Sequence, residues 1–295
     1  MRELLQLIAN GTVAGSVVAL GAVGVSLVYG ILRIVNFAQG DYFTAGAYTA
    51  VYVSSIGLGM VGATALAGVA GLVLAVVLEL VLWRPLRRRG ASFMSLFIAS
   101  IGLALVLRNV IFLAATAEPR SYPVDVFQVY ALGPVRISKT QAIAVAVAIA
   151  TIALVSVLLA RTSLGRSMRA LADDAVLAAV AGVAVNRVIV ATWALSGALA
   201  GLAGVLAALV QSSFDPNVGF GILLPVFAAV VLGGIGSAYG ALVGGLAIGI
   251  VTEASTWSAL AGGVNPVYKP VVAFAVLIAS LLVRPQGLFG RTRIL

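Results

Sequence analysis

Long uninterrupted apolar runs are the feature that most constrains how this chain folds. Segments such as Val61–Trp83 and Thr140–Ala160 stay apolar for about twenty residues, the length that a helix needs to cross the hydrocarbon of a bilayer. Hydrocarbon offers no partner for a free backbone N–H or C=O, so a spanning segment is either a helix or a strand of a closed barrel. Barrel strands alternate apolar and polar residues over about ten positions. The continuous runs therefore predict membrane-spanning helices.

The composition narrows the possible functions. Only 9% of the residues are charged, against about a quarter in a soluble domain, so lipid must cover much of the surface. The absence of cysteine and histidine removes disulfides, thiolate nucleophiles, imidazole bases and nearly every zinc or haem site. We therefore expect no catalytic residue, no metal site and no enzymatic activity. The net charge is +9, and the arginines lie in short loops between the apolar runs. This pattern matches the positive-inside rule of membrane proteins better than a nucleic-acid-binding surface.

The apolar runs predict an all-α, polytopic transmembrane helical bundle of about eight membrane segments, folded as a single domain over residues 1–295. Arginines gather in the loop Arg84–Arg89, in the loop Arg161–Arg187 and in the tail after Arg284. Positively charged short loops stay in the cytoplasm, which leaves the loop Glu118–Ser138 outside. The predicted segments are Leu4–Leu32, Ile34–Ile56, Val61–Trp83, Phe93–Ala115, Thr140–Ala160, Val188–Val210, Ile222–Thr252 and Val267–Val283.

The segment Ile222–Thr252 departs from the simple pattern because glycines interrupt it at Gly233, Gly234, Gly236 and Gly240. Each glycine weakens a helix by about 1 kcal/mol relative to alanine. The stretch is therefore predicted to be broken into two short helices or to form a re-entrant hairpin. Broken helices often line a solute path; close helix packing around a kink is the alternative.

Ionisable side chains inside apolar spans are candidates for function because burying them in a membrane is costly. Asp41, with Asn36 and Gln39 as polar neighbours, either lies beside the solute path or serves as a helix cap or a partner of Arg108. Arg108 needs a carboxylate, and Asp41 and Glu253 are available. The candidate translocation path consists of Asn36, Gln39, Asp41, Arg108, Gly233, Gly234, Gly236 and Glu253.

Two other features are interpreted without a functional role. Glu79 lies one turn from Arg84, so an ion pair at the membrane interface explains it. The segment Gly133–Thr140 looks like a phosphate-binding loop, but Ser138 stands where that motif requires glycine. Any ATP must then be hydrolysed by another subunit.

The loop 161–187 is expected to be cytoplasmic and to form one or two short amphipathic helices. Leu171, Val176, Ala179 and Val180 recur at helical spacing, and Arg169, Asp173 and Asp174 occupy the polar side. A helix of this kind is suited to docking into a groove of a partner protein. The alternative is an interfacial helix that rests on lipid head groups.

Four stretches in order carry a resemblance to a known family: Asn10–Asp41, Ser163–Val183 (SLGRSMRALADDAVLAAVAGV), Phe227–Gly249 (FAAVVLGGIGSAYGALVGGLAIG) and Arg284–Gly290 (RPQGLFG). Together they resemble the permease subunits of branched-chain amino acid ABC importers, the LivH type. The stretches look like that family's first two membrane segments, its ATPase-contacting segment, its glycine-rich late segment and its C-terminal signature. Gln39 stands where the family commonly has histidine, and Arg108 where glutamine is frequent.

The resemblance implies a permease subunit in the cytoplasmic (inner) membrane that translocates branched-chain or other small neutral amino acids. Its partners would be a second homologous permease, two ATPase subunits, a periplasmic or extracellular solute-binding protein and membrane lipid. The chain would bind no cofactor itself, and ATP with Mg would bind the ATPases. A permease for urea or short amides and an ion-coupled secondary transporter are the alternatives. The implied ATPase-coupling residues are Gly165, Arg166, Arg169, Ala170, Asp173, Asp174 and Gly182.

Overall fold

The computed structural model describes residues 2–115, 118–124, 128–132, 135–258, 263–284 and 286–289. Gly133 of the loop-like segment, and Pro285 and Gly290 of the C-terminal motif, lie outside these ranges. The described helices are α1 (Arg2–Leu32), α2 (Gln39–Ser55), α3 (Met60–Leu78), α4 (Arg84–Arg88), α5 (Phe93–Ala115), α6 (Lys139–Arg161), α7 (Ser163–Asp173), α8 (Ala175–Val180), α9 (Val185–Gln211), α10 (Val218–Gly233), α11 (Ala238–Ala254) and α12 (Lys269–Val283). A π-helical turn (Glu79–Trp83) joins α3 to α4, and a 3₁₀ turn (Pro266–Tyr268) precedes α12.

The helices are long enough and apolar enough to cross a bilayer in six places within the described residues. Four of these spans, built on α3 with α4, α5, α6 and α12, keep most of their surface exposed, with at most 28% of the apolar window buried. In water such exposure would be a strong drive to aggregate, but in a membrane it is the surface that lipid covers. The shorter apolar helices α10 and α11 complete the bundle together with α2.

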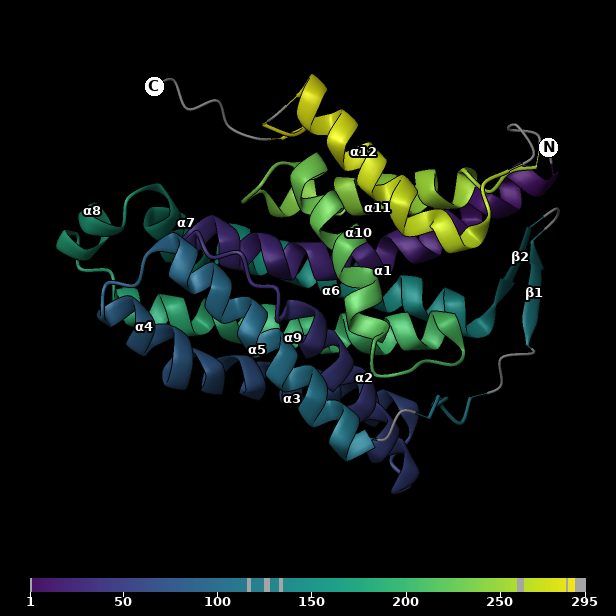
Figure 1. Ribbon diagram of the computed structural model, residues 1–295, viewed down its shortest axis with the longest axis horizontal. Helices are drawn as coiled ribbons and strands as arrows, with labels where there is room; N and C mark the ends of the chain where they lie inside the picture. Colours follow the sequence, from purple (N-terminus) through teal and green to yellow (C-terminus); the bar gives the residue numbers. More distant parts are fainter. Residues whose placement is uncertain are drawn as a thin grey trace.

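The core of the bundle is formed by α1 and α9, whose apolar windows are 78% and 72% buried. α1 packs along α11 through small residues, since a Cβ on Gly249 would meet the backbone of Gly15 and a Cβ on Gly245 would meet Ala19. Small residues let helix backbones approach closely where lipid provides no hydrophobic drive for association. In Figure 1 α1 runs along the long axis of the molecule.

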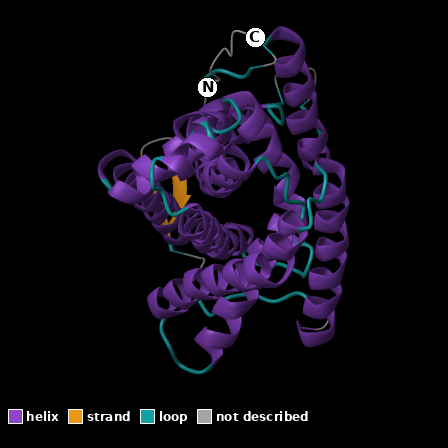
Figure 2. Cartoon of the chain, turned by 90° about the vertical axis from the view of Figure 1, so that its left-hand side faces the viewer, coloured by secondary structure: helices purple, strands orange, loops and turns teal. Residues whose placement is uncertain are grey.

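The two ends of the bundle carry different structures. α4, α7 and α8 lie together at one end, and the antiparallel hairpin of β1 (Val129–Leu132) and β2 (Val135–Ser138) lies at the other (Figure 1). Figure 2 looks at the molecule from the α7–α8 end and shows the hairpin behind the helices. The sequence places the loop Glu118–Ser138 outside the membrane and makes no prediction of this hairpin. Ser138 ends β2 and caps α6, accepting a hydrogen bond from Gln141 N (3.2 Å).

The loop before the hairpin folds back on the bundle. Arg120 pairs with Phe214 through two backbone hydrogen bonds of 2.8 and 2.9 Å. The hydroxyl of Tyr122 donates to the carbonyl of Ala47 (3.0 Å), and the ring packs against Phe214. Burial raises the pKa of the Tyr122 phenol, which therefore stays a protonated donor.

The start of the second predicted segment differs from the structure, whereas the predicted break in the glycine-rich stretch is confirmed. The second segment begins as a helix at Gln39 and not at Ile34, because the chain turns out of α1 at Arg33 (φ +56°) and residues 33–38 are not helical. The glycine-rich stretch forms α10 and α11, which pack against each other across a turn in which Gly234 and Gly236 have φ of +102° and +87°. Left-handed backbone of this kind favours glycine.

The close packing at Gly201 leads to a prediction about the stability of the fold. Replacing Gly201 with valine should prevent folding, because a Cβ at Gly201 would overlap the backbone of Ala67 on α3 and both backbones are held by their helices. Gly102→Val on α5 is the matched control, since a Cβ there meets none of the described residues within 4 Å. Size-exclusion chromatography of detergent-solubilised membranes should show a monodisperse peak for Gly102→Val and aggregate or no protein for Gly201→Val. Equal yields would contradict the packing.

Candidate functional site

A buried polar network lies where α1 ends and α2 begins. Asn36 and Gln39 are only 3% and 1% exposed. The Asn36 side chain accepts a hydrogen bond from Ala38 N (3.1 Å) and donates to Gln39 Oε1 (3.3 Å). These bonds turn the chain from the non-helical segment 33–38 into α2, and they explain why the helix does not start at Ile34. A polar side chain buried in an apolar bundle needs such partners.

The network continues across two other helices. Gln39 Nε2 donates to Ser196 Oγ on α9 (3.2 Å), and Ser196 Oγ donates to the carbonyl of Gly24 on α1 (2.9 Å). Ser100 on α5 accepts a hydrogen bond from Phe37 N (3.3 Å). Hydrogen bonds of Phe37, Gln39 and Ser196 therefore connect α1, α2, α5 and α9.

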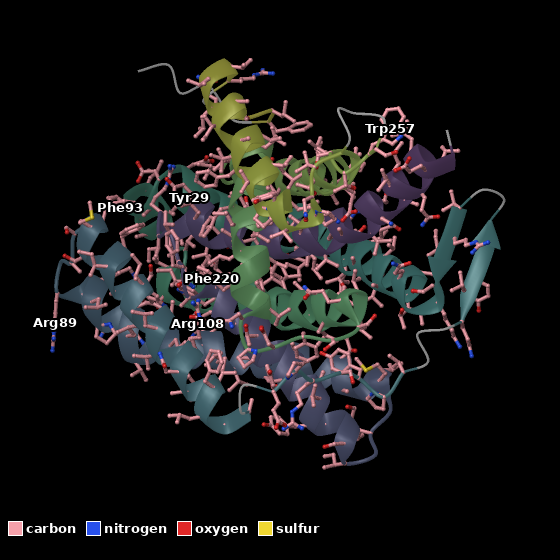
Figure 3. The ribbon with its side chains drawn as sticks, turned by 45° about the vertical axis from the view of Figure 1, so that its right-hand side comes forward. Tyr29, Arg89, Phe93, Arg108, Phe220 and Trp257 are labelled. Atoms are coloured by element: carbon pink, nitrogen blue, oxygen red, sulfur yellow. The ribbon has the colours of Figure 1, made fainter. Side chains whose placement is uncertain are left out.

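The ion pair of Asp41 and Arg108 lies next to this network. Arg108 Nε donates to Asp41 Oδ1 (3.2 Å), and the guanidinium carbon of Arg108 stands 4.2 Å from the ring centroid of Phe220 on α10 (Figure 3). The Asp41 side chain is 1% exposed and that of Arg108 is 18% exposed. Asp41 Oδ2 is buried without a hydrogen-bond partner among the described residues. Of the two carboxylates considered for Arg108, Asp41 is the partner.

Glycines hold the start of α2 deep in the bundle. A Cβ on Gly219 would overlap the carbonyl of Gly40, and one on Gly204 would overlap that of Phe43. Thr44 Oγ1 accepts a hydrogen bond from Gly219 N (3.1 Å). α10 and α9 thus approach α2 at backbone contact and keep water and lipid from Asp41.

The remaining residues of the predicted path lie elsewhere. Glu253, at the end of α11, accepts a hydrogen bond from Lys269 Nζ on α12 (2.6 Å) and not from Arg108. Gly233 packs against Gly240 within the α10–α11 hairpin, and Gly236 packs against Gly30 near the end of α1. Gly234 contacts Gly287 of the C-terminal motif. The structure therefore brings Asn36, Gln39, Asp41 and Arg108 together. The three glycines lie at the α10–α11 turn, where they allow close backbone contacts.

One buried group was wrongly interpreted from the sequence. The prediction of an interfacial ion pair between Glu79 and Arg84 is wrong, because Glu79 is 1% exposed and accepts hydrogen bonds from both terminal nitrogens of Arg87, one of them at 3.0 Å. The π-helical turn Glu79–Trp83 inserts a residue into the helical register. It buries Trp83, which stacks on Trp193 of α9 with centroids 5.6 Å apart and planes at 6°. The sequence offered one signal, a glutamate and a tryptophan inside an apolar run.

The loop 161–187 forms the two helices α7 and α8. α7 is held by Met168 and Leu171, which are buried against Val188 of α9. Gly165 allows α7 to touch the Leu159 carbonyl, and the Arg169 guanidinium donates to that same carbonyl. Arg169 therefore helps to fix the joint between α6 and α7.

α8 is short and projects its apolar side chains outward. Asp174 caps it, with Oδ1 accepting from Val176 N (2.8 Å) and Leu177 N (2.9 Å), and Gly182 ends the turn after it with φ +85°. Val176, Leu177 and Val180 are 75%, 67% and 81% exposed. The prediction that Leu171 shares a helix face with Val176 and Val180 is wrong, because the chain leaves α7 at Asp174. The three remaining predicted coupling residues, Arg166, Ala170 and Asp173, are all exposed.

These features define a class of protein. Apolar helices form the outer surface, a polar network and an ion pair are buried at a helix break, and an amphipathic two-helix segment projects from one end. This is a multi-pass membrane protein of the transport class. The chain belongs to the family described as "branched-chain amino acid transport system / permease component", whose model matches residues 7–281.

The descriptions of individual proteins with similar sequences match that of the family. The chain is 34% identical to the high-affinity branched-chain amino acid transport system permease protein BraD of Pseudomonas aeruginosa, covering 98% of this chain and 97% of that protein. It is 31% identical to LivH of Escherichia coli, a permease protein of the same description, over 98% and 96%. A probable LivH of Methanocaldococcus jannaschii is 33% identical over 91% and 87%. No solved structure matches the chain significantly.

Proposed function

We propose that this chain is the membrane-spanning permease subunit of an ABC importer that carries branched-chain amino acids, or other small neutral amino acids, across the cytoplasmic membrane. The observation that carries the proposal is the similarity to branched-chain amino acid permeases along nearly the whole chain. Two further observations support it: a polar network at a break between helices and an apolar helix exposed beyond the bundle.

The proposed topology has about eight membrane segments. Six are the long helices, α2 is a seventh, and the α10–α11 hairpin enters and leaves on the same side. α2 has 17 residues, at the lower limit for a spanning helix. α4, α7 and α8 face the cytoplasm in this arrangement, which agrees with the arginines of α4 and α7.

The proposed path for the solute passes the start of α2. Discontinuous helices near the middle of the membrane present polar groups that a continuous helix would use internally. The non-helical segment 33–38 supplies this geometry. Asn36, Gln39, Asp41 and Arg108 are the side chains that we assign to the path. Gly233, Gly234 and Gly236 would serve the hairpin turn instead.

The energy would come from partner subunits. Two ATPases would bind ATP with Mg and contact α7 and α8, a second homologous permease would complete the channel, and an external solute-binding protein would deliver the solute. ATP-driven closure of the ATPases would favour one orientation of the bundle through contacts that exist in that state alone. The chain itself would hold no cofactor.

Two alternatives are less well supported. In an ion-coupled transporter Asp41 or Glu253 would carry a proton, but in this structure both are engaged in ion pairs, with Arg108 and Lys269 respectively. A permease for urea or short amides would share the same architecture, but the named relatives that cover nearly the whole chain are branched-chain amino acid permeases.

Reconstitution tests the proposal. Proteoliposomes that contain this chain alone should show no concentrative uptake of leucine, with or without an imposed pH gradient. Proteoliposomes with the second permease, both ATPases and the binding protein should accumulate leucine when ATP is supplied on the ATPase side. The measured quantity is radiolabelled leucine retained after filtration. Accumulation by this chain alone would overturn the ABC assignment, and uptake of urea in place of leucine would overturn the substrate.

A further inference from the structure

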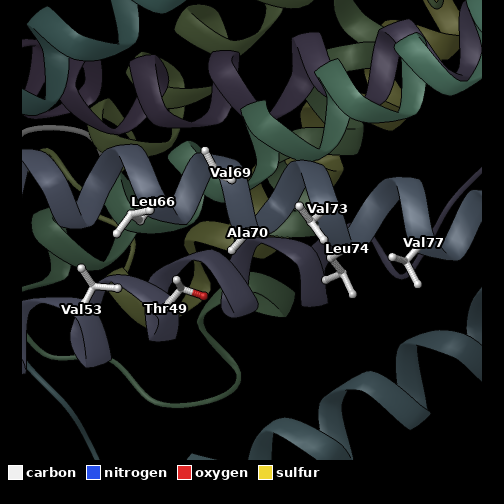
Figure 4. A pocket seen from close by; sticks show the side chains of 8 residues that line it. All are labelled: Thr49, Val53, Leu66, Val69, Ala70, Val73, Leu74 and Val77. Carbon is white, nitrogen blue, oxygen red and sulfur yellow. The ribbon is translucent and has the colours of Figure 1, made fainter.

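An apolar groove runs along the lipid-facing side of α2 and α3. Figure 4 shows the side chains that line it, and its volume is about 550 Å³. From Leu66 to Val77 it follows α3 for eleven residues, about 16 Å at the helical rise, which is close to half of the roughly 30 Å hydrocarbon core. The groove therefore has the length of an acyl chain in one leaflet. The side chains that line it include Thr49 and Val53 of α2 and Leu66, Val69, Val73 and Val77 of α3.

The groove leads toward the arginine cluster of α4. Val69, Val73 and Val77 repeat every four residues, and Val81, 70% exposed, follows at the same interval inside the π-helical turn. The wider turn of a π-helix keeps this four-residue repeat near one face. An exposed apolar stripe thus connects the groove to the end of the helix where α4 begins.

The cluster at that end has more positive charge than the protein neutralises. Glu79 bonds Arg87, whereas Arg84, Arg88 and Arg89 have no acidic partner in the part of the chain that the structure describes. Arg88 and Arg89 are exposed, and in Figure 3 the side chain of Arg89 extends away from the helices at the outer edge of the molecule. Guanidinium groups bind phosphate through two parallel hydrogen bonds.

We propose that α3 and α4 form a binding site for one anionic phospholipid of the cytoplasmic leaflet. The phosphate would lie at Arg88 and Arg89, and one acyl chain would follow the stripe into the groove between α3 and α2. Charge complementarity selects an anionic lipid over a zwitterionic one, and the length of the groove selects a molecule with a long apolar chain. This site is separate from the solute path, so it stands whichever solute crosses the membrane.

Native mass spectrometry of the full-length protein in detergent tests the site. The probes are phosphatidylglycerol and phosphatidylcholine with identical acyl chains, titrated separately. Each arginine near a membrane surface contributes about 1 kcal/mol toward an anionic lipid, so Arg88→Gln with Arg89→Gln should weaken the first phosphatidylglycerol adduct roughly thirtyfold. Arg33→Gln with Arg284→Gln removes the same charge from exposed positions elsewhere and should leave that adduct unchanged.

The groove is tested by Val73→Trp, which fills it from an exposed position. Loss of about two methylene contacts should weaken the phosphatidylglycerol adduct roughly tenfold, whereas Val271→Trp on the exposed face of α12 should have no effect. Equal affinity of the wild-type protein for the two lipids would overturn the proposal. So would unchanged phosphatidylglycerol affinity in either the arginine or the Val73 variant. If Val73→Trp does not fold, Val69→Trp at the same groove replaces it.

Discussion

Replacing Arg108 with leucine should destabilise the folded protein by roughly 3–5 kcal/mol. The substitution leaves the carboxylate of Asp41, which is 1% exposed, without its cation in the interior of a membrane protein. Its second oxygen already has no hydrogen-bond partner among the described residues, so nothing nearby takes over the charge. Equilibrium unfolding in mixed micelles, followed by the fluorescence of the stacked Trp83 and Trp193, measures the loss.

The double substitution Arg108→Leu with Asp41→Asn separates structure from transport. Removing both charges together should recover more than half of the stability lost in Arg108→Leu, because the unpaired charge is gone. If the pair only holds the bundle together, uptake recovers with stability. If Arg108 also contacts the solute, the double variant folds but does not transport. Additive losses in the two single variants would show that the two side chains do not interact, which contradicts the observed geometry.

The sequence predicts the bundle because length and apolarity decide membrane insertion. α5 spans Phe93–Ala115, the predicted range, since its polar side chains Ser100 and Asn109 donate to carbonyls one turn earlier in the same helix and leave the helix unbroken. The second segment was mispredicted at its start because Asn36 bonds the backbone of Ala38, and side chains of this kind compete with helix formation. A hydropathy pattern carries no information about that competition.

The candidate site was predictable in part. Charged and amide side chains in apolar runs identified Asn36, Gln39, Asp41 and Arg108, and their mutual contacts follow from the cost of burying them unpaired. The π-helical turn could not be predicted in the same way, because it shifts the register by one residue. That shift is what directs Glu79 to Arg87 and not to Arg84.

The same limit applies to α7 and α8. The spacing of Leu171, Val176 and Val180 suggests one amphipathic face, but the extended backbone of Asp174 (φ −152°, ψ 113°) separates the two helices. Their apolar residues therefore have different roles. Leu171 packs inside the protein, and the residues of α8 remain available to a partner.

Replacing Leu177 and Val180 together with aspartate should abolish ATP-driven uptake. Both side chains lie on α8 beyond the end of the bundle, 67% and 81% exposed, where an ATPase subunit would bury them. Apolar anchors of an interface contribute at least about 2 kcal/mol each, so the two aspartates should weaken association on the order of hundredfold or more. Co-purification of the tagged permease with its ATPases measures this directly.

The control variant introduces two aspartates outside α8. Val264→Asp with Val267→Asp introduces them at exposed positions between α11 and α12, and it should leave ATPase co-purification intact. Arg169 is unsuited to the test, because its guanidinium donates to the Leu159 carbonyl and its loss would loosen the joint between α6 and α7. Normal co-purification and uptake in the α8 variant would show that its exposed apolar residues rest on lipid head groups and not on an ATPase.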